Sequence, residues 1–462
     1  MSYDPTTHQP LTFFDVLPRY ETGDDTPRDY LERCIEVIEE RDSVIQAYVS
    51  LNLESARSAA DESSKRWRRG QARSPVDGMP ISIKDLLETK DMPTQMGCEA
   101  FAGNFPRRDN AAVWALRDAG AVILGKTVTA ELGGAHPGPT TNPFDPSRTP
   151  GGSSSGSAAA VAAGMVPAAL GSQVGGSIIR PSGYCGNVSL KPTQGAINRG
   201  ERQATSMSTH GVHAGCVEDM WQVAIEIAKR AGGDRGFRSL LGPDEPPSAT
   251  PVESLIVLET AGWNQLDSSS RGAFEGLIAQ LEAMGIRVLR RADHRAIEDF
   301  ERTIENAAEI CASITGWENR WSTRNLVDQS PGQVSQRAKL ILEKSEQLTP
   351  ADYEHYLSLR AQAQISHAAL AGLADAAVTL SCPGPAPVWN GDTPGEPLAP
   401  RPTGDAIFNY PSSMTFAPCV SMPLLSVQGL PVGVQLMGQQ HEDARMTALA
   451  RWMLGAVSPV SA

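Results

Sequence analysis

The sequence of 462 residues has no excess of positive charge and no long apolar segment. Its formal net charge is −13, which would repel phosphate groups, so we expect no binding to nucleic acid. The longest mostly apolar run, residues 158–170, contains Gly164 and Pro167 and is too short for a bilayer about 30 Å thick. The first residues show neither the basic nor the apolar segment of a signal peptide. We therefore expect a cytoplasmic protein that does not associate with membranes.

Cysteine is sparse and shows no paired spacing. The seven cysteines are scattered, their number is odd, and no Cys-x-x-Cys occurs. This pattern argues against a disulfide framework and against a zinc site built from cysteines. We expect free buried thiols in a reducing compartment.

The remaining composition is that of an ordinary folded protein, with 40% apolar and 20% charged residues. Residues 78–87 read as a buried strand, 111–119 as a helix and 121–124 as a second strand. Such alternation favours an α/β sheet covered on both faces. We find no internal repeat and no strong linker, so one large domain is the simplest interpretation.

Other segments follow the same reasoning. Residues 157–169 are small and compatible with a helix, and residues 383–405 are rich in Pro and Gly and predict a long loop. Two apolar runs between 420 and 436 flank Gly429-Leu430-Pro431. The remaining expected elements are helices within 27–70, a strand at 255–258, a helix at 268–284, a strand at 286–289, helices over most of 295–373, a strand at 377–380 and a last helix near the C-terminus.

The glycine- and serine-rich stretch 151–181 is the most informative part of the chain. Ser153 and Ser177 each follow a Gly-Gly pair directly, and Lys84 lies upstream at the end of an apolar segment. A serine hydroxyl attacks poorly unless another group accepts its proton. A buried lysine can accept it, because burial lowers the pKa of its ammonium group from about 10.4. These residues could therefore supply a nucleophile, a proton relay and a base without a histidine.

Other interpretations of this stretch are weaker. A phosphate-binding P-loop requires a lysine directly after Gly156, and none is present. Residues 152–156 fit G-x-S-x-G with Ser154 as nucleophile, but that motif follows a strand, and residues 142–150 do not read as one. A flexible linker would not usually precede a small-residue helix and an apolar strand. A Ser-His site is also weaker, because three candidate histidines have no evident aspartate partner: His136, His210 and His213.

Several motifs, in order along the chain, resemble the amidase signature family. They are Gly-x-Pro-x-x-x-Lys-Asp at 78–85, Ala-Gly-Ala-Val-Ile-Leu-Gly-Lys-Thr at 119–127, Gly-Gly-Ser-Ser-Ser-Gly-Ser at 151–157, Gly-Gly-Ser-Ile at 175–178, Leu-Lys-Pro-Thr at 190–193 and Gly-Leu-Pro-Val-Gly-Val-Gln-Leu at 429–436. The resemblance spans about residues 26–455. It implies an α/β fold in one large domain, residues 1–462, with a twisted mixed sheet flanked by helices on both faces. Its expected parts are N-terminal helices at 26–75, a signature core at 76–225, a mainly helical elaboration at 230–375, and C-terminal strands and a helix at 376–455.

The resemblance also implies a role for each matching residue. Ser177 matches the nucleophile, Lys84 the base, and Ser153 the bridging serine, which in this family sits on a cis peptide bond. The turn Val174-Gly175-Gly176-Ser177 matches the backbone that forms the oxyanion hole. The family needs no metal or other cofactor for this chemistry, so we expect none.

The chain departs from the common family pattern next to the nucleophile. Gln173 replaces the usual aspartate four residues before Ser177, and Ile179 replaces the usual arginine two residues after it, with Arg180 following. These changes resemble a variant branch of bacterial small-amide hydrolases. The signature does not identify the substrate, and the weaker candidates for contacting it are His136, Met207 and Trp317.

Three functions are compatible with the sequence. The first is a hydrolase of a small amide, anilide or urea-like compound, acting through an acyl-enzyme on Ser177. The second is the catalytic A component of a tRNA-dependent amidotransferase, a glutaminase that shares the signature and would require partner proteins. The third is a non-catalytic binding protein, which the intact Lys84, Ser153 and Ser177 argue against. The expected partner is a small-molecule amide, and a homodimer is left open.

Overall fold

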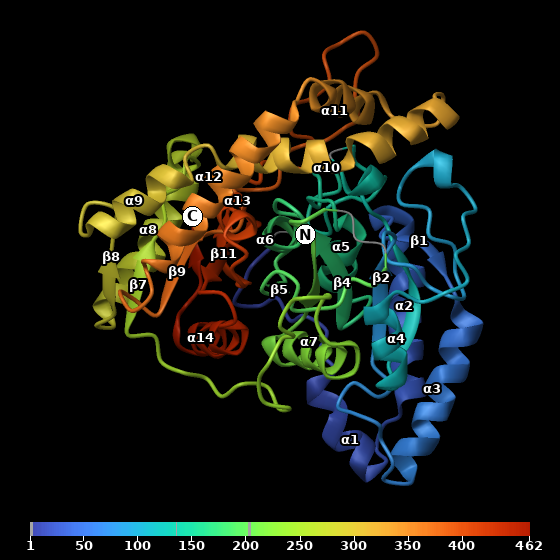
Figure 1. Ribbon diagram of the computed structural model, residues 1–462. Coiled ribbons are helices and arrows are strands. Elements are labelled where there is room, and N and C mark those ends of the chain that lie inside the picture. Colours follow the sequence, from blue (N-terminus) through green and yellow to red (C-terminus); the bar gives the residue numbers. More distant parts are fainter. Residues whose placement is uncertain (1–2, 135, 202–204) are drawn as a thin grey trace.

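The computed structural model describes residues 3–134, 136–201 and 205–462, and its strands form one mixed twelve-stranded sheet (Figure 1). The order across the sheet is β1-β3-β2-β4-β6-β5-β10-β11-β9-β7-β8, and β12 pairs with β10. Strand β2 runs parallel to both β3 and β4, whereas the central pairs from β4 to β9 are antiparallel. The strands are β1 (Tyr48–Leu51), β2 (Pro80–Lys84), β3 (Val122–Thr127), β4 (Ala168–Gln173), β5 (Val188–Lys191), β6 (Thr209–Ala214), β7 (Ser254–Val257), β8 (Arg287–Leu289), β9 (Ala376–Leu380), β10 (Cys419–Val427), β11 (Leu430–Met437) and β12 (Val460–Ser461).

Helices cover this sheet and extend beyond it. The described α-helices are α1 (Leu17–Thr22), α2 (Pro27–Ile45), α3 (Leu53–Arg68), α4 (Ala111–Asp118), α5 (Ser155–Ala162), α6 (Ile179–Cys185), α7 (Val217–Ala231), α8 (Ser268–Ala283), α9 (Arg295–Thr303), α10 (Ala307–Gln329), α11 (Gln336–Glu346), α12 (Pro350–Ala368), α13 (Tyr410–Met414) and α14 (Asp443–Ala456). Short 3₁₀ turns occur at Phe14–Val16, Glu99–Phe101, Glu131–Gly133 and Trp263–Gln265. Figure 1 shows α10, α11 and α12 together beyond one end of the central strands.

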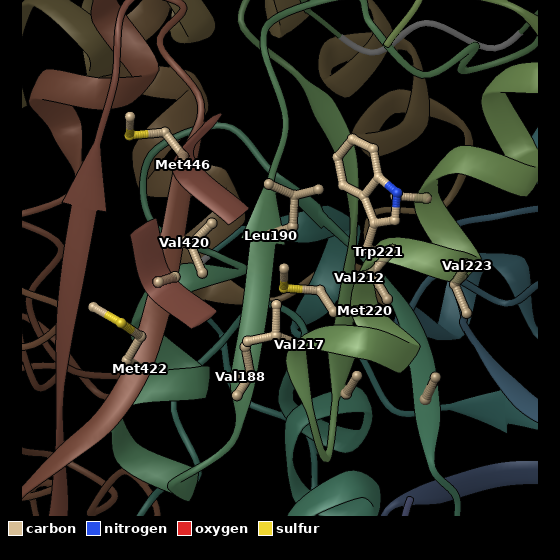
Figure 2. Packing of buried hydrophobic residues seen from close by; sticks show 14 of the residues in the cluster. Val188, Leu190, Val212, Val217, Met220, Trp221, Val223, Val420, Met422 and Met446 are labelled. Carbon is tan, nitrogen blue, oxygen red and sulfur yellow. The ribbon is translucent and has the colours of Figure 1, made fainter. Parts of the chain in front are cut away.

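The alternation of side chains along β4 shows that the two faces of the sheet are covered by different helices. Ala168 and Leu170 belong to the core cluster that includes α7, whereas Ala169 packs in the cluster that contains the alanines of α5. Successive side chains of a strand point to opposite faces. Figure 2 shows the α7 side, where Met220 and Trp221 lie beside strands β5 and β6. Both faces of the sheet are therefore buried, as predicted.

Helix α5 lies very close to the neighbouring chain, and a glycine makes this possible. A Cβ atom on Gly156 would come within 2.2 Å of the carbonyl oxygen of Ala47 and 2.6 Å of the amide nitrogen of Val128. The Gly156 amide donates a hydrogen bond to the Val128 carbonyl at 3.0 Å. The first turn of α5, directly after the Gly/Ser loop, is thus fixed against the end of β3.

Three local predictions need correction. Strand β1 lies inside the region 27–70 that we predicted as helical, because Tyr48, Ser50 and Leu51 pair antiparallel with β3. Helix α5 ends at Ala162, and residues after Pro167 form β4, so the small-residue stretch is only partly helical. Helix α6, directly after Ser177, was not predicted. The hairpin β10–β11 and the lack of helix or strand at 383–405 agree with prediction.

Three further findings concern the predictions from composition. All seven cysteines are free thiols. Within residues 3–134, 136–201 and 205–462, no helix has the length and apolar character needed to cross a membrane. In the same ranges, no group of three or more His, Cys, Asp or Glu residues is arranged to hold a metal ion.

Candidate active site

Lys84 ends the buried central strand β2 and is completely shielded from solvent. Its neighbours Ile81 and Ile83 pack in the core cluster that includes α7. Because side chains alternate along a strand, Lys84 points to the opposite face, where the Gly/Ser loop enters α5. The strand thereby places a lysine at the start of that helix.

The Lys84 ammonium group is surrounded by hydroxyl and carbonyl oxygens. Its Nζ lies 2.7 Å from Ser153 Oγ and 2.9 Å from Ser154 Oγ. It also lies 3.0 Å from Ser172 Oγ and 3.1 Å from the Ser172 carbonyl oxygen. Burial is the main cause that holds the pKa of Lys84 well below its ordinary value, and the positive charge of Arg180 adds to the effect.

The carboxylate next to Lys84 in the sequence is engaged elsewhere. Asp85 Oδ1 lies 3.0 Å from Lys126 Nζ, and both side chains are buried. Asp85 Oδ2 accepts a hydrogen bond from the Gln95 amide at 3.0 Å. Asp85 therefore stabilises the loop after β2, and these contacts give it no part in the chemistry.

Ser153 follows a cis peptide bond with Gly152, as the resemblance implied. Its carbonyl accepts a hydrogen bond from the Ala130 amide at 3.0 Å, and its hydroxyl borders a cavity. Ser154 differs from it, because its side chain is fully buried and its hydroxyl donates to the Ser172 carbonyl at 3.2 Å. The serine of the formal G-x-S-x-G motif thus faces the sheet and does not line the cavity among the described residues.

Gln173 shapes the turn that carries Ser177. Its Oε1 accepts hydrogen bonds from the amides of Ile178 at 2.9 Å and Ile179 at 3.0 Å. Its Nε2 donates to the Gly175 carbonyl at 3.3 Å and to Ser413 Oγ at 3.1 Å. An amide oxygen can accept these backbone bonds as a carboxylate would, so the replacement of the usual aspartate leaves the turn intact.

The turn itself leaves backbone donors available. Among the described residues, the amides of Gly175, Gly176 and Ser177 have no backbone or side-chain acceptor, whereas the two amides that follow are bound by Gln173. A Cβ atom on Gly176 would lie 2.5 Å from Asn409 Oδ1, so no larger residue fits there. These amides have the character of the oxyanion hole that we predicted for Val174, Gly175, Gly176 and Ser177; that role stays a prediction.

Ser177 and Ser153 border the same cavity of about 390 Å³, which is also lined by the turn 174–176. The backbone joins the two serine segments directly, since the Ser154 amide donates to the Ser177 carbonyl at 3.3 Å. Within the described residues, no hydrogen bond joins the hydroxyl groups of Ser153 and Ser177. Catalytic hydrogen bonds often shorten when substrate binds.

The three weaker candidates for contacting substrate lie in different surroundings. His136 lines the cavity, and its Nδ1 is buried without a hydrogen-bond partner. Met207 is buried in a core cluster. Trp317 stacks on Tyr353 with ring centroids 5.6 Å apart and lies under the Arg320 guanidinium. Only His136 of these three is among the described residues that line the cavity.

The alternative histidines lie on β6 beside the lysine and away from Ser177. Burial lowers the pKa values of both His210 and His213 to about 3, so both are neutral. His213 is paired in the strand register with Ala169, and His210 with Ser172. Neither lines the cavity with Ser177 among the described residues, so the structure does not assemble a Ser-His site.

Sequence reasoning missed several residues of the cavity wall. Thr403 comes from the long loop, Ala406 from the short segment after it, and Tyr410 from the start of α13. Arg337 and Leu342 come from α11. The Pro- and Gly-rich composition of 383–405 indicated a functional loop, but no motif there identified individual contacts.

Comparisons with known proteins place the chain among related sequences. A family model described as Amidase matches residues 29–446. The A component of a glutamyl-tRNA(Gln) amidotransferase from Chloroflexus aggregans is 40% identical over 236 residues, which are 49% of this chain and 48% of that protein. The corresponding mitochondrial protein from Rattus norvegicus is 27% identical, and the match covers 96% of this chain and 93% of that one. The first relatives are thus matched over about half of their length or less.

Solved structures show the same fold. One described as an amidase has a TM-score of 0.82 and 28% identity, and the match covers 97% of this chain and all of that one. A peptide amidase from Stenotrophomonas maltophilia has a TM-score of 0.76 and 24% identity, covering 97% and 98% of the two chains. At that lower identity the likeness concerns the fold alone.

Proposed function

The chain belongs to the amidase signature family, and from this premise we propose that it hydrolyses the C–N bond of a small amide, anilide or urea-like compound through an acyl-enzyme on Ser177. The observation that carries the proposal is the 2.7 Å contact between Lys84 Nζ and Ser153 Oγ, beside a cavity that also contains Ser177. A cavity of about 390 Å³ suits a small molecule.

The contacts of Lys84 support its action as a base. The Ser172 carbonyl can only accept, and Ser154 uses its proton on that same carbonyl, so these two oxygens take the two N–H groups of a neutral amine. The nitrogen lone pair then faces the two remaining hydroxyls, and we assign the proton donor as Ser153, because its Oγ lies closer, at 2.7 Å, than Ser172 Oγ at 3.0 Å. When substrate brings Ser177 Oγ to Ser153 Oγ, Ser177 can give its proton to Ser153 while Ser153 gives its own to Lys84.

The reaction then follows in two halves. Ser177 Oγ bonds to the substrate carbonyl carbon, and the amides of residues 175–177 bind the oxyanion that forms. The relay returns a proton from Lys84 through Ser153 to the leaving nitrogen, because an unprotonated amide anion is a very poor leaving group. Water then attacks the acyl-enzyme with the same relay as base, which releases the acid and restores Ser177.

Covalent labelling tests this proposal. A fluorophosphonate should react with the wild-type chain at Ser177, and fragmentation of the labelled peptide should place the added mass within residues 174–180. Ser177→Ala should lose both the label and amide hydrolysis, whereas Ser322→Ala, an exposed serine of α10, should keep both. A Ser177→Ala chain that still turns over amides at the wild-type rate would refute the assignment.

A second candidate function rests on the names of the relatives, many of which are A components of glutamyl-tRNA(Gln) amidotransferases. In that case the chain would act as a glutaminase that depends on partner proteins. The purified chain decides between the two functions: efficient hydrolysis of small amides without partners favours the first, and glutaminase activity only with co-purifying proteins favours the second. A chain that binds amides but shows neither activity would instead indicate the non-catalytic binding protein.

A further inference from the structure

The peptide group between Gly175 and Gly176 is held by hydrogen bonds at one end only. Its bond is trans, so the carbonyl oxygen and the amide hydrogen point in opposite directions. The Gly175 carbonyl accepts hydrogen bonds from Ser413 Oγ at 2.9 Å and from Gln173 Nε2 at 3.3 Å. The Gly176 amide has no backbone or side-chain acceptor among the described residues. The protein therefore fixes the carbonyl end of this peptide group and leaves the amide end available.

The two donors to the Gly175 carbonyl lie on the side of the turn away from the cavity. Gly175 and Gly176 line the cavity, whereas Ser413 and Gln173 are not among the described residues that line it. Ser413 is 3% exposed and Gln173 is 1% exposed. Because the carbonyl is held toward the protein interior, the Gly176 amide is directed the opposite way, toward the cavity. A donor to an oxyanion needs this direction.

The opposite orientation of the same peptide group would remove this donor. Rotation of the peptide plane by half a turn would place the Gly175 carbonyl oxygen in the cavity and the Gly176 amide in the interior. Glycine permits such rotations more readily than other residues. Both positions require glycine, because a Cβ atom would lie 2.7 Å from the Tyr410 ring at 175 and 2.5 Å from Asn409 Oδ1 at 176. Contacts outside the turn must therefore select the orientation.

Ser413 is the contact that is best placed to select it. It lies in α13, 238 residues along the chain from Gly175. Its hydroxyl accepts a hydrogen bond from Gln173 Nε2 at 3.1 Å, so its single proton is available for the Gly175 carbonyl. Gln173 cannot turn over its amide group without losing the bonds from the amides of Ile178 and Ile179 to its Oε1. The donor and acceptor roles in this network are thus fixed.

We infer that Ser413 is a positioning residue, which locks the peptide group between Gly175 and Gly176 in the orientation that directs the Gly176 amide at the developing oxyanion. The chemical role of that amide rests on the proposed function, whereas the orientation itself does not. The oxyanion exists in the transition state and not in the bound substrate, so loss of the Ser413 hydroxyl should lower kcat and leave KM nearly unchanged.

Nuclear magnetic resonance can test the orientation without turnover. Glycine labelled with ¹³C at the carbonyl and ¹⁵N at the amide gives a one-bond carbonyl–amide correlation only where two glycines are adjacent. The chain has four such pairs, at 133–134, 151–152, 175–176 and 232–233. Ser413→Ala should shift the 175–176 signal and leave the other three unchanged. Ser412→Ala is the matched control and should shift none, because this buried hydroxyl of the same helix bonds to the Asn409 carbonyl.

Steady-state kinetics tests the consequence for the reaction. In Ser413→Ala, kcat for a small amide should fall about tenfold, the effect of one hydrogen bond of about 1.4 kcal/mol, while KM stays within about twofold. Ser413→Cys keeps a weaker donor of similar size, so its kcat should lie between those of the wild type and Ser413→Ala. Ser412→Ala should keep both constants.

The outcomes separate this inference from the proposed function. An unchanged 175–176 signal in Ser413→Ala, an equal shift in Ser412→Ala, or an unchanged kcat in Ser413→Ala would overturn the inference. A tenfold rise in KM at unchanged kcat would also overturn it, because the hydroxyl would then act in substrate binding. If Ser413→Ala does not fold, the same measurements on Ser413→Cys decide the question. A shifted signal in Ser413→Ala, with a wild-type chain that hydrolyses none of a panel of amides, would instead overturn the proposed function.

Discussion

The replacement Gln173→Leu tests how the nucleophile turn is held. Leucine has a similar volume but removes the oxygen that accepts from the buried amides of Ile178 and Ile179. A buried donor left without an acceptor costs about 1–3 kcal/mol, so the two together should lower the free energy of unfolding by about 2–6 kcal/mol. Unfolding entropy near 2.1 cal/mol/K per residue gives about 1 kcal/mol/K for 462 residues. The expected fall in Tm is therefore about 2–6 °C.

The same change should reduce catalysis. The turn places the free amides of residues 175–177, and the misplacement or loss of one oxyanion donor costs about 10²–10³ in rate. We expect kcat for a small amide to fall about 10²-fold or more. Scanning calorimetry and steady-state kinetics on the same preparation measure both effects.

A matched control keeps this test specific. Gln280→Leu on α8 removes one accepted and one donated hydrogen bond, both to Ser458 at the surface, and Gln280 is not among the described residues that line the cavity. It should change Tm by about 1 °C or less and leave kcat unchanged. A Gln173→Leu chain with wild-type Tm and wild-type kcat would show that Gln173 does not hold the turn.

Three further predictions concern the base, the neighbouring serine and the packing of α5. Activity should rise with pH as Lys84 loses its proton, because only the neutral amine can accept a proton, and the rise should occur well below the ordinary lysine pKa. The pH profile of kcat/KM measures this rise, which should be absent in Lys84→Ala. A rise that is retained in Lys84→Ala would contradict the assignment of Lys84 as the base. Ser154→Ala should slow hydrolysis, because it removes the 2.9 Å contact between Ser154 Oγ and Lys84 Nζ, but it should keep the fluorophosphonate label on Ser177. If mass spectrometry finds no label in Ser154→Ala, Ser154 is favoured as the nucleophile. Gly156→Val should lower Tm by several degrees or prevent folding, because the Cβ atom of the valine would lie 2.2 Å from the Ala47 carbonyl oxygen. An unchanged Tm would contradict the close packing of α5.

The sequence was sufficient for the parts of the site that are encoded in contiguous motifs. Lys84 and Ser153 lie in separate motifs, and the fold brings Lys84 Nζ to 2.7 Å from Ser153 Oγ, as the resemblance to the family implied. Each motif combines a special backbone geometry with a reactive side chain, so few other sequences can replace it. The alternation of strands and helices predicted that helices cover both faces of the sheet, because hydrophobic periodicity is also a local property of the sequence.

Other features depend on tertiary contacts that a local pattern does not encode. Strand β1 is only four residues long and lies between two helices, and its pairing with β3 outweighs the helical tendency of its surroundings. Gln173 can bind the amides of residues 178 and 179 only because the turn folds back onto its side chain, and a glutamine at position 173 does not by itself predict that arrangement. Met207 and Trp317 are weak candidates for contacting substrate, and the fold places Met207 in a core cluster and Trp317 against Tyr353. Tyr410 and Thr403 reach the cavity from segments more than 200 residues away from Ser177.

The most direct test of the account is to trap its covalent intermediate. A slowly deacylating aryl ester or amide should be mixed with the wild-type chain, quenched in acid within the first turnover, digested and analysed by mass spectrometry. We predict the acyl mass on the peptide that contains Ser177, and its disappearance in Ser177→Ala. Acyl mass on Ser153 or Ser154, or full turnover by a Ser177→Ala chain that carries no acyl group, would contradict the account.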